Sequence, residues 1–281
     1  MVLYKKYTRL IICLCVLFCS LVMAQNNDNK AWRELTAKQG LVIAYFKKNG
    51  ERTYARSESM YYRVLLKLNN TESYQVQDFY TKNNAKQISP ITLTDVTDAY
   101  SWQPKSIQGK ITYWRTDGSK EAETTYQQGM LEGTYQTWYS SGSLRSEGFY
   151  KADKLQGRYT FWYETGEKEE EFFYVDDNLH GSYKEWYRSG QLSYEANYEN
   201  DHESGTVNFW YENGQLKEQY IRLNGEIEGI YKTWHDNGQL ASQKTYKAGK
   251  IIGEAKGWDK QGNLLYTHRY KNGHVLWPQK L

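Results

Sequence analysis

The feature that most constrains this chain is a column of tryptophans at constant spacing. Seven of them stand 24 residues apart, at Trp114, Trp138, Trp162, Trp186, Trp210, Trp234 and Trp258. A glycine follows each tryptophan four residues later, at Gly118, Gly142, Gly166, Gly190, Gly214, Gly238 and Gly262. Another glycine precedes each by five residues, and a tyrosine follows by twelve except at Arg222. Three residue types in step seven times indicate a repeat architecture.

One repeat reads as two strands and two turns. Residues 133–139 and 143–150 are rich in aromatic and β-forming residues. The three-residue loop between them contains Gly142, which suits a left-handed backbone because glycine has no Cβ. The other connection carries Gly or Asp, as at Asp153. Helical periodicity is absent. The sequence therefore predicts an all-β fold, a single elongated, twisted antiparallel meander of tandem 24-residue β-hairpin repeats with an irregular N-terminal cap.

Alternation along the strands predicts which side chains share a face. With a three-residue loop, Trp138 lies opposite Leu144 and Tyr135 lies opposite Glu147. One face then carries the tryptophans, the leucines and the late tyrosines such as Tyr150. The other face carries the remaining tyrosines. We expect the tryptophan column to pack between neighbouring hairpins, because a thin sheet lacks a deep core.

These residues resemble the MORN repeat family, in particular the bacterial variant that appears in proteins named as antitoxins. The motif Gly-x-Tyr-x-x-Trp-Tyr-x-x-Gly-x-Leu, then Tyr-x-x-Gly, stands most cleanly at residues 229–240, closed by Tyr246 and Gly249, with His235 replacing the second tyrosine. The match covers about residues 109–273, and the first and last copies depart from it, as terminal repeats often do. The resemblance implies an elongated β-sheet that serves as a scaffold or binding surface, and it implies no catalytic residues.

The chain divides into four parts. Residues 1–24 combine a basic start, an apolar run and a small residue before a polar stretch, which predicts a cleaved secretory signal peptide, with an uncleaved anchor as the alternative. Residues 25–108 keep no 24-residue frame and read as an N-terminal β-rich cap with degenerate repeats, or as a separate partner-binding module. Residues 109–273 hold seven repeats, and residues 274–281 read as a C-terminal tail.

Weaker patterns occur inside the N-terminal part. Residues 30–38 predict a short helix. Two fragments look like decayed hairpins, with Gly50 in the left-handed place of one and Asn83 in that of the other. Residues 61–68 and 74–80 flank a polar turn and predict a further hairpin.

Residues that could carry chemistry are few. All three cysteines lie within residues 1–24, and the five histidines keep no metal-ligand spacing. Neither a phosphate-binding loop nor a Gly-x-Ser-x-Gly elbow occurs. An acidic column nine residues after the tryptophans predicts a solvated or cross-strand paired row, or alternatively a stripe for a basic partner or calcium: Glu123, Glu147, Glu171 and Glu195. We expect no enzymatic activity, no metal and no cofactor.

Charge argues against one class of partner. Removal of residues 1–24 takes away three basic residues and no acidic ones, which leaves equal numbers of each. A chain without net charge lacks the electrostatic footprint of a general nucleic-acid binder. The leader predicts export, to the periplasm, the cell surface or the medium.

The long regular surface favours a non-enzymatic, exported scaffold that binds a protein partner through aromatic side chains. Tyrosine combines apolar area with a polar tip. The candidate partner-binding residues are therefore Tyr135, Tyr139, Tyr159, Tyr163, Tyr183, Tyr187 and Tyr211, for which internal packing is the other interpretation. The alternative functions are an envelope glycan or membrane-surface binding module and, from the resemblance, an antitoxin-type protein that neutralises a partner toxin.

Overall fold

The computed structural model describes residues 40–69 and 73–279. The predicted signal peptide and the predicted helix at residues 30–38 lie outside this range. The described residues form two compact units, one with residues 40–69, 73–119 and 126–130, the other with residues 120–125 and 131–279. Neighbouring strands pair antiparallel in both units. Two short 3-10 helices are the only helices among the described residues, and none is long and apolar enough to span a membrane.

The first unit is a small sheet with its own core. Its elements are β1 (Leu41–Phe46), β2 (Arg52–Thr53), η1 (Arg56–Glu58), β3 (Tyr61–Asn69), β4 (Ser73–Tyr80), β5 (Ile91–Leu93), η2 (Val96–Tyr100) and β6 (Ile107–Trp114). Strand β1 pairs with β2 and β3, and the sheet continues through β4 and β5 to β6. Two buried clusters fill it, one around Val76, Ile91 and Ile111, the other around Tyr62 and Phe79.

The hairpins predicted in this unit are present, with one change. Gly50 has a φ of 80° and closes a three-residue loop, and β3 pairs with β4 as expected. The prediction for Asn83 is wrong, because Asn84 is the residue with positive φ, at 57°. The loop is one residue longer than in the repeats, since the N–H of Tyr80 donates to the carbonyl of Ala85 at 2.8 Å.

The first predicted repeat is divided between the two units: residues 109–119 and 126–130 belong to the first, whereas residues 120–125 belong to the second, where β7 (Lys120–Gln127) pairs with β9 (Gly133–Trp138). Ile111 and Tyr113 of β6 pack with the cluster around Ile91, and Ile111 is 1% exposed. Four of the six later copies place tyrosine where Ile111 stands, and Val207 and Ala255 are the exceptions. The unit boundary therefore differs from the predicted one at residue 109.

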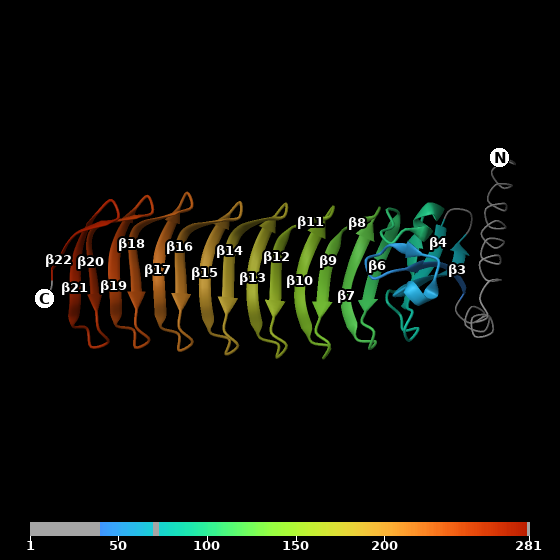
Figure 1. The fold of residues 1–281 in the computed structure, drawn as a ribbon, viewed down its shortest axis with the longest axis horizontal. Helices are drawn as coiled ribbons and strands as arrows, with labels where there is room; N and C mark the ends of the chain where they lie inside the picture. The colour runs from blue at the N-terminus through green and yellow to red at the C-terminus, as the bar shows by residue number, and fades with distance from the viewer. Residues whose placement is uncertain (1–39, 70–72, 280–281) are drawn as a thin grey trace. The chain divides into compact units, whose positions relative to one another are not determined.

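The second unit is a row of hairpins (Figure 1). Two strands contribute to both units, β7 (Lys120–Gln127) and β8 (Met130–Leu131). The others are β9 (Gly133–Trp138), β10 (Leu144–Lys151), β11 (Lys154–Leu155), β12 (Gly157–Trp162), β13 (Lys168–Val175), β14 (Asn178–Trp186), β15 (Leu192–Glu199), β16 (His202–Trp210), β17 (Leu216–Leu223), β18 (Glu226–Trp234), β19 (Leu240–Lys247), β20 (Lys250–Trp258), β21 (Leu264–Lys271) and β22 (His274–Gln279). Each strand from β12 onward pairs with the next, which confirms the predicted hairpin meander. Residues 274–279, predicted as a tail, form the last strand.

The loop after each tryptophan has the predicted geometry. In the second repeat the N–H of Tyr139 donates to the carbonyl of Ser143 at 2.9 Å, and that of Gly142 donates to the carbonyl of Tyr139 at 3.0 Å. All seven glycines of this column have φ between 81° and 105°. Side chains with a Cβ avoid this backbone region. The column is therefore required by the loop.

The second connection is tighter than the sequence indicated. Glu199 pairs with His202, so only two residues, Asn200 and Asp201, form the turn. Both have positive φ, 49° and 66°. Two consecutive left-handed residues define a type I′ turn, whose twist matches that of the flanking strands. The prediction of a left-handed Gly or Asp is confirmed, and the preceding residue shares the conformation.

A β-bulge next to each tryptophan changes the predicted faces. Trp138 lies opposite Leu144 as expected, but Tyr135 lies opposite Gly148 and not Glu147. The pairing shifts between Leu144 and Ser146, because a bulge sets two residues of one strand against one of the other. A shift by one residue moves the following side chains to the other face. The late tyrosines therefore share a face with the early ones, which corrects the predicted arrangement.

Replacement of Gly190 by Val tests the loop. Gly190 has a φ of 81°, and a Cβ there would meet nothing within 4 Å. Backbone strain alone should therefore lower the free energy of unfolding, by about 1–2 kcal/mol. Urea melts should also show a smaller loss for Gly190→Asn, since Asn tolerates this region better. Equal stability of the Val variant and the unaltered chain would contradict the loop assignment.

Candidate functional site: the two faces of the repeat sheet

One face of the second unit carries a continuous row of aromatic rings, which we name the ladder face. Phe172 stacks on Tyr159 and on Tyr183, with ring centroids 5.7 and 5.2 Å apart. The row continues from strand to strand through Tyr194, Phe209, Tyr220, Tyr231 and Tyr246. Each aromatic pair contributes about 0.5–1.5 kcal/mol beyond its buried area. The ladder face is the packed side of this thin sheet.

Small residues make room for the rings. A Cβ on Gly148 would overlap the ring of Tyr159, although the backbone of Gly148 is not left-handed. Gly257 lies in the same way under Tyr266. Ala196 and Val207 on this face are 1% and 0% exposed. The sequence offered no signal for Gly148 and Gly257, because these glycines lie outside the repeat frame.

Carboxylates lie among the rings and accept hydrogen bonds from them. The hydroxyl of Tyr194 donates to Glu203 at 2.7 Å, and that of Tyr231 donates to Glu218 at 2.7 Å. Arg222 Nε donates to Glu203 at 2.9 Å. Burial and the Glu203 carboxylate raise the pKa of Tyr220 to about 12, so its hydroxyl stays protonated. Arg222, which interrupts the tyrosine column, thus supplies the cation that pairs with the half-buried carboxylate of Glu203. Glu203 was not identified from the sequence.

Four of the candidate tyrosines join each hairpin to the next. The hydroxyls of Tyr139, Tyr163, Tyr187 and Tyr211 donate to the backbone carbonyls of Trp162, Trp186, Trp210 and Trp234, at distances of 2.8, 2.7, 2.8 and 2.9 Å. His235, which replaces the tyrosine in the next copy, places Nε2 2.9 Å from the carbonyl oxygen of Trp258. The other three candidates, Tyr135, Tyr159 and Tyr183, lie on the ladder face. The structure thus gives all seven a contact within the chain, and their partner-binding role stays a prediction.

The opposite ends of the hairpins are also joined. The carboxylate of Asp177 accepts from the N–H of Leu155 at 2.7 Å, and the N–H of Asp177 donates to the carbonyl of the same residue at 3.1 Å. Asp153 and Asp201 repeat this pair of bonds. Where glycine replaces the aspartate, as at Gly249, only the backbone bond remains. Aspartate tolerates the left-handed position here because its side chain gains a hydrogen bond.

The other face, which we name the tryptophan face, is more open. The six tryptophans of the second unit are half-buried, and lysines lie over two of the rings. The Lys120 Nζ atom lies 3.7 Å from the ring centroid of Trp138. The tryptophans therefore pack less deeply than we expected from the sequence.

The acidic column lies on this face and is paired, as predicted. Each carboxylate meets a side chain of its own or the neighbouring strand: Glu123 with Lys120 at 2.9 Å, Glu147 with Gln136 at 2.6 Å, Glu171 with Lys168 at 2.6 Å and Glu195 with Lys184 at 3.1 Å. Asn208 and Gln219 continue the row as a neutral pair. Three of the four carboxylates are thus balanced by a lysine, and Glu147 accepts from a neutral amide. Among the described residues, no group of three or more acidic, histidine or cysteine side chains could hold a metal ion.

Apolar side chains stand exposed beside this paired row. Phe149, Ile221 and Ile230 are 44%, 43% and 49% exposed. Phe149 and Ile221 lie two positions from Glu147 and Gln219 of this row, and Ile230 lies four positions from Trp234. All three therefore point to the tryptophan face. Phe149 lies on β10, whereas Ile221 and Ile230 lie on the paired strands β17 and β18.

Comparison with known proteins agrees with the repeat geometry. A family model described as MORN repeat variant matches residues 131–152, 155–176, 179–200, 203–224 and 227–248, which confirms the resemblance. No curated protein matches the chain significantly. One solved structure with some likeness is a mutant of TarM from S. aureus in complex with Fondaparinux, alpha-GlcNAc-glycerol and UDP. It is 15% identical with a TM-score of 0.20, and the match covers 43% of this chain and 19% of that one, which is too weak to support an argument.

Replacement of Tyr163 by Phe tests the bond between hairpins. It removes the hydroxyl that donates to the Trp186 carbonyl and leaves the ring. We expect the free energy of unfolding in urea to fall by about 0.5–1.5 kcal/mol. Tyr266→Phe is the matched control, because the described part of the chain gives this hydroxyl no hydrogen-bond partner. Equal effects of the two changes would argue against a structural role for the Tyr163 bond.

Replacement of Glu170 by Gln tests the charges on the ladder face. Burial raises the pKa of the Glu170 carboxyl, and the nearby Glu185 carboxylate adds to the effect. The folded state therefore holds this proton more tightly than the unfolded state, whose pKa is about 4.3. The stability due to Glu170 is present below that pH and is lost as the pH rises through the raised pKa.

The amide removes this dependence. In urea melts, Glu170→Gln should equal the unaltered chain at about pH 4 and exceed it in stability at about pH 7.5. The exposed Glu212, replaced by Gln in the same way, is the control. A variant that is less stable than the unaltered chain at the higher pH would overturn the assignment.

Proposed function

Residues 131–248 belong to the MORN repeat variant family, and we propose that this chain is an exported, non-enzymatic scaffold that binds a protein partner on the tryptophan face. The observation that carries the proposal is the contrast between the two faces. On the ladder face the aromatic rings pack against one another. The tryptophan face keeps half-buried indole rings and exposed apolar side chains beside paired charges.

This assignment moves the proposed surface away from the tyrosines. Their hydroxyls and rings have partners within the chain, so a second protein would have to replace those contacts. On the tryptophan face a partner would bury exposed apolar surface, and each Å² removed from water would stabilise the complex by about 25 cal/mol. No hydrogen bond within the chain would have to break. Balanced charge favours a partner recognised by apolar contact and hydrogen bonds over one attracted by net charge.

A pull-down with the chain as bait tests the proposal, from envelope and secreted fractions. The test variant replaces Phe149, Ile221 and Ile230 with Ser, which removes three exposed apolar side chains of the tryptophan face and should not disturb packing. The matched control replaces Val275 and Leu276 with Ser, since both are exposed on the last strand, β22, at 46% and 54%. We expect one protein to be retained by the unaltered chain and by the control, and to be lost from the test variant.

The tyrosine interpretation is tested in the same experiment. A bait with Tyr139, Tyr163 and Tyr187 changed to Phe keeps the rings and should retain the partner. Loss from this bait alone would place the binding surface on the tyrosines. If no bait retains a protein, the scaffold proposal fails. Quenching of tryptophan fluorescence by soluble envelope glycan, or sedimentation with lipid vesicles, would then decide between the other two functions.

A further inference from the structure

Five asparagines of the described chain stand directly before a glycine: Asn49, Asn213, Asn224, Asn237 and Asn272. Such a pair is able to modify itself, because the backbone nitrogen of the glycine reaches the side-chain amide carbon with no Cβ in the way. Asparagine counts among the thermally labile residues of proteins. In a folded chain the reaction requires that the glycine N–H is free and that the peptide between the two residues is able to turn over.

Two of the five pairs lie in three-residue loops of the second unit, where both reacting groups are bonded. The N–H of Gly214 donates to the carbonyl of Tyr211 at 2.9 Å, and the Asn213 side chain accepts one backbone hydrogen bond and donates another. Residues 237 and 238 repeat these bonds in the next hairpin. The structure therefore protects both pairs.

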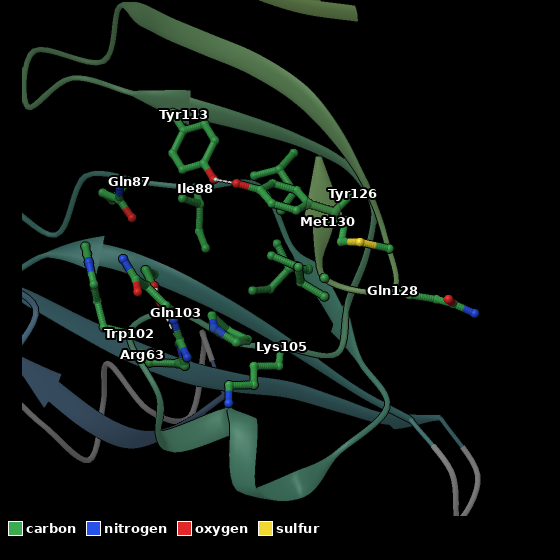
Figure 2. A pocket seen from close by; sticks show the side chains of 16 residues that line it. Arg63, Gln87, Ile88, Trp102, Gln103, Lys105, Tyr113, Tyr126, Gln128 and Met130 are labelled. Atoms are coloured by element: carbon green, nitrogen blue, oxygen red, sulfur yellow. Dashed lines mark hydrogen bonds and ion pairs between the residues drawn. The ribbon is translucent and has the colours of Figure 1, made fainter. Parts of the chain in front are cut away.

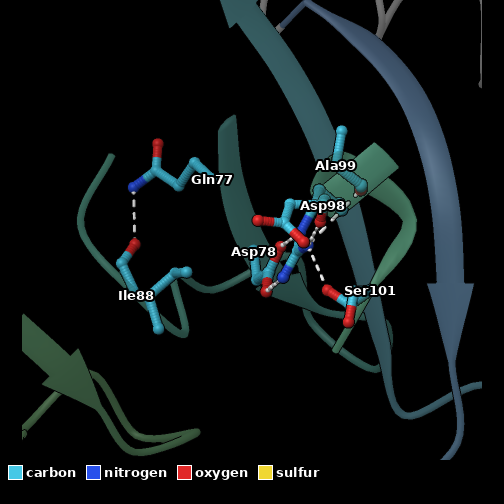
Figure 3. A network of polar contacts seen from close by, with 7 residues as sticks. Gln77, Asp78, Ile88, Asp98, Ala99 and Ser101 are labelled. Carbon is cyan, nitrogen blue, oxygen red and sulfur yellow. Dashed lines mark hydrogen bonds and ion pairs between the residues drawn. The ribbon is translucent and has the colours of Figure 1, made fainter. Parts of the chain in front are cut away.

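The pair in the first unit is held by the core. The N–H of Gly50 donates to the carbonyl of Lys47 at 3.0 Å, and a Cβ on Gly50 would overlap the ring of Trp102. Trp102 lines a cavity of about 620 Å³ in this unit (Figure 2). Its neighbour Ser101 is fixed, since the Ser101 carbonyl accepts from Arg63 Nη1 at 2.6 Å in a buried polar network (Figure 3). This loop is not able to rearrange without disturbing buried contacts.

The two remaining pairs form nearly identical turns. Asn224 and Gly225 have φ of 52° and 80°, and Asn272 and Gly273 have φ of 51° and 83°. Each pair alone connects two paired strands, which makes both turns type I′. All four residues are exposed. The two turns are therefore a matched pair inside one chain.

One hydrogen bond distinguishes them. The glycine or aspartate N–H of the other six turns of this kind donates to a backbone carbonyl at 2.9–3.1 Å: Gly129 to Ile107, Asp153 to Leu131, Asp177 to Leu155, Asp201 to Leu179, Gly249 to Ile227 and Gly273 to Ile251. The N–H of Gly225 meets no acceptor in the described part of the chain. The residue in the accepting position there is Glu203, where every other copy has Ile or Leu.

The missing bond leaves the peptide between Asn224 and Gly225 free to turn over. This movement converts a type I′ turn into a type II′ turn, in which the first central residue keeps its positive φ and the second changes sign. Glycine accepts both signs of φ. At Gly273 the movement breaks a hydrogen bond, whereas at Gly225 it breaks none. The first central residue of a type II′ turn has ψ of about −120°, which brings the next backbone nitrogen to the same side as its side chain.

We propose that Asn224 is a site of spontaneous deamidation. The nitrogen of Gly225 bonds to Cγ of Asn224, the bond from Cγ to Nδ2 breaks, and Nδ2 leaves as ammonia with the proton of the Gly225 N–H. Water then adds to either carbonyl carbon of the resulting succinimide and opens the ring, which yields aspartate or isoaspartate at position 224. The reaction needs water alone, and it is independent of the function proposed for the tryptophan face.

The products differ in what they do to the hairpin of β17 and β18. Aspartate keeps the turn, since Asp176 holds the same place in another copy with a φ of 49°. Isoaspartate adds a methylene to the backbone of a turn whose geometry depends on two residues. Each product also adds a negative charge beside Arg222, whose Nη1 donates to the Gly225 carbonyl at 3.0 Å.

Peptide mapping by mass spectrometry, with isoaspartate quantified, tests the site on the full chain stored in neutral buffer. We expect Asn224 to lose its amide about tenfold faster than Asn272, which has to break a hydrogen bond first. The three pairs in three-residue loops should stay intact. In urea, where no turn is folded, all five should react at similar rates. Equal rates at Asn224 and Asn272 in the folded chain would overturn the proposal, as would a faster reaction of Asn224 in urea.

Two matched variants check the result through the ammonia released. Glutamine cyclises far more slowly than asparagine, and Gln128 shows that this turn position accepts it, with a φ of 52°. Asn224→Gln should abolish the early release of ammonia from the folded chain. Asn272→Gln should release as much as the unaltered chain. Release that persists in Asn224→Gln, or that is lost in Asn272→Gln, would assign the reaction to another residue.

Discussion

The β-bulge beside each tryptophan determines how the rest of the second unit is built. The three-residue loop ends on a left-handed glycine, and the pairing slips by one residue on the strand that follows. This slip brings Tyr150 and Tyr135 onto one face, with ring centroids 5.7 Å apart. Without it the tyrosines would divide between the faces and no continuous ladder could form. The packed rings of the ladder face, the carboxylates among them and the more open tryptophan face all follow from this local geometry.

Much of this fold could be predicted from the sequence, because the repeat determines where the turns lie. It determines less strongly which side chains share a face of the sheet. The glycines at positions such as Gly142 occupy a backbone region that excludes most other residues, so their spacing identified the hairpins and their loops. The facing of Tyr135 was wrong because a bulge changes alternation without leaving a residue type of its own in the strand. Glu203 could have been found from Arg222, where a cation interrupts a column of tyrosines.

The first unit was harder to read, for a different physical reason. Its core is assembled from strands of unequal length and from the short helix η2, whose carbonyls accept from Arg63. Contacts of this kind join residues about 35 positions apart, such as Arg63 and Asp98, and follow no period. Neither the buried Arg63–Asp78 pair nor the cavity that it lines has a sequence signature. Sequence patterns indicate turns and the alternation of side chains between two faces. A cavity depends instead on contacts between segments that are far apart in the sequence.

The bonds that join successive hairpins have a consequence for the folding of the row. The hydroxyl of Tyr163 and the carbonyl it meets lie 23 positions apart along the chain, and the carboxylate of Asp177 lies 22 positions from the N–H it accepts. Every repeat closes loops of this same length, so the entropy lost on closure does not grow as hairpins are added. The sheet can lengthen while its contacts remain local in sequence, a property of topologies that fold quickly.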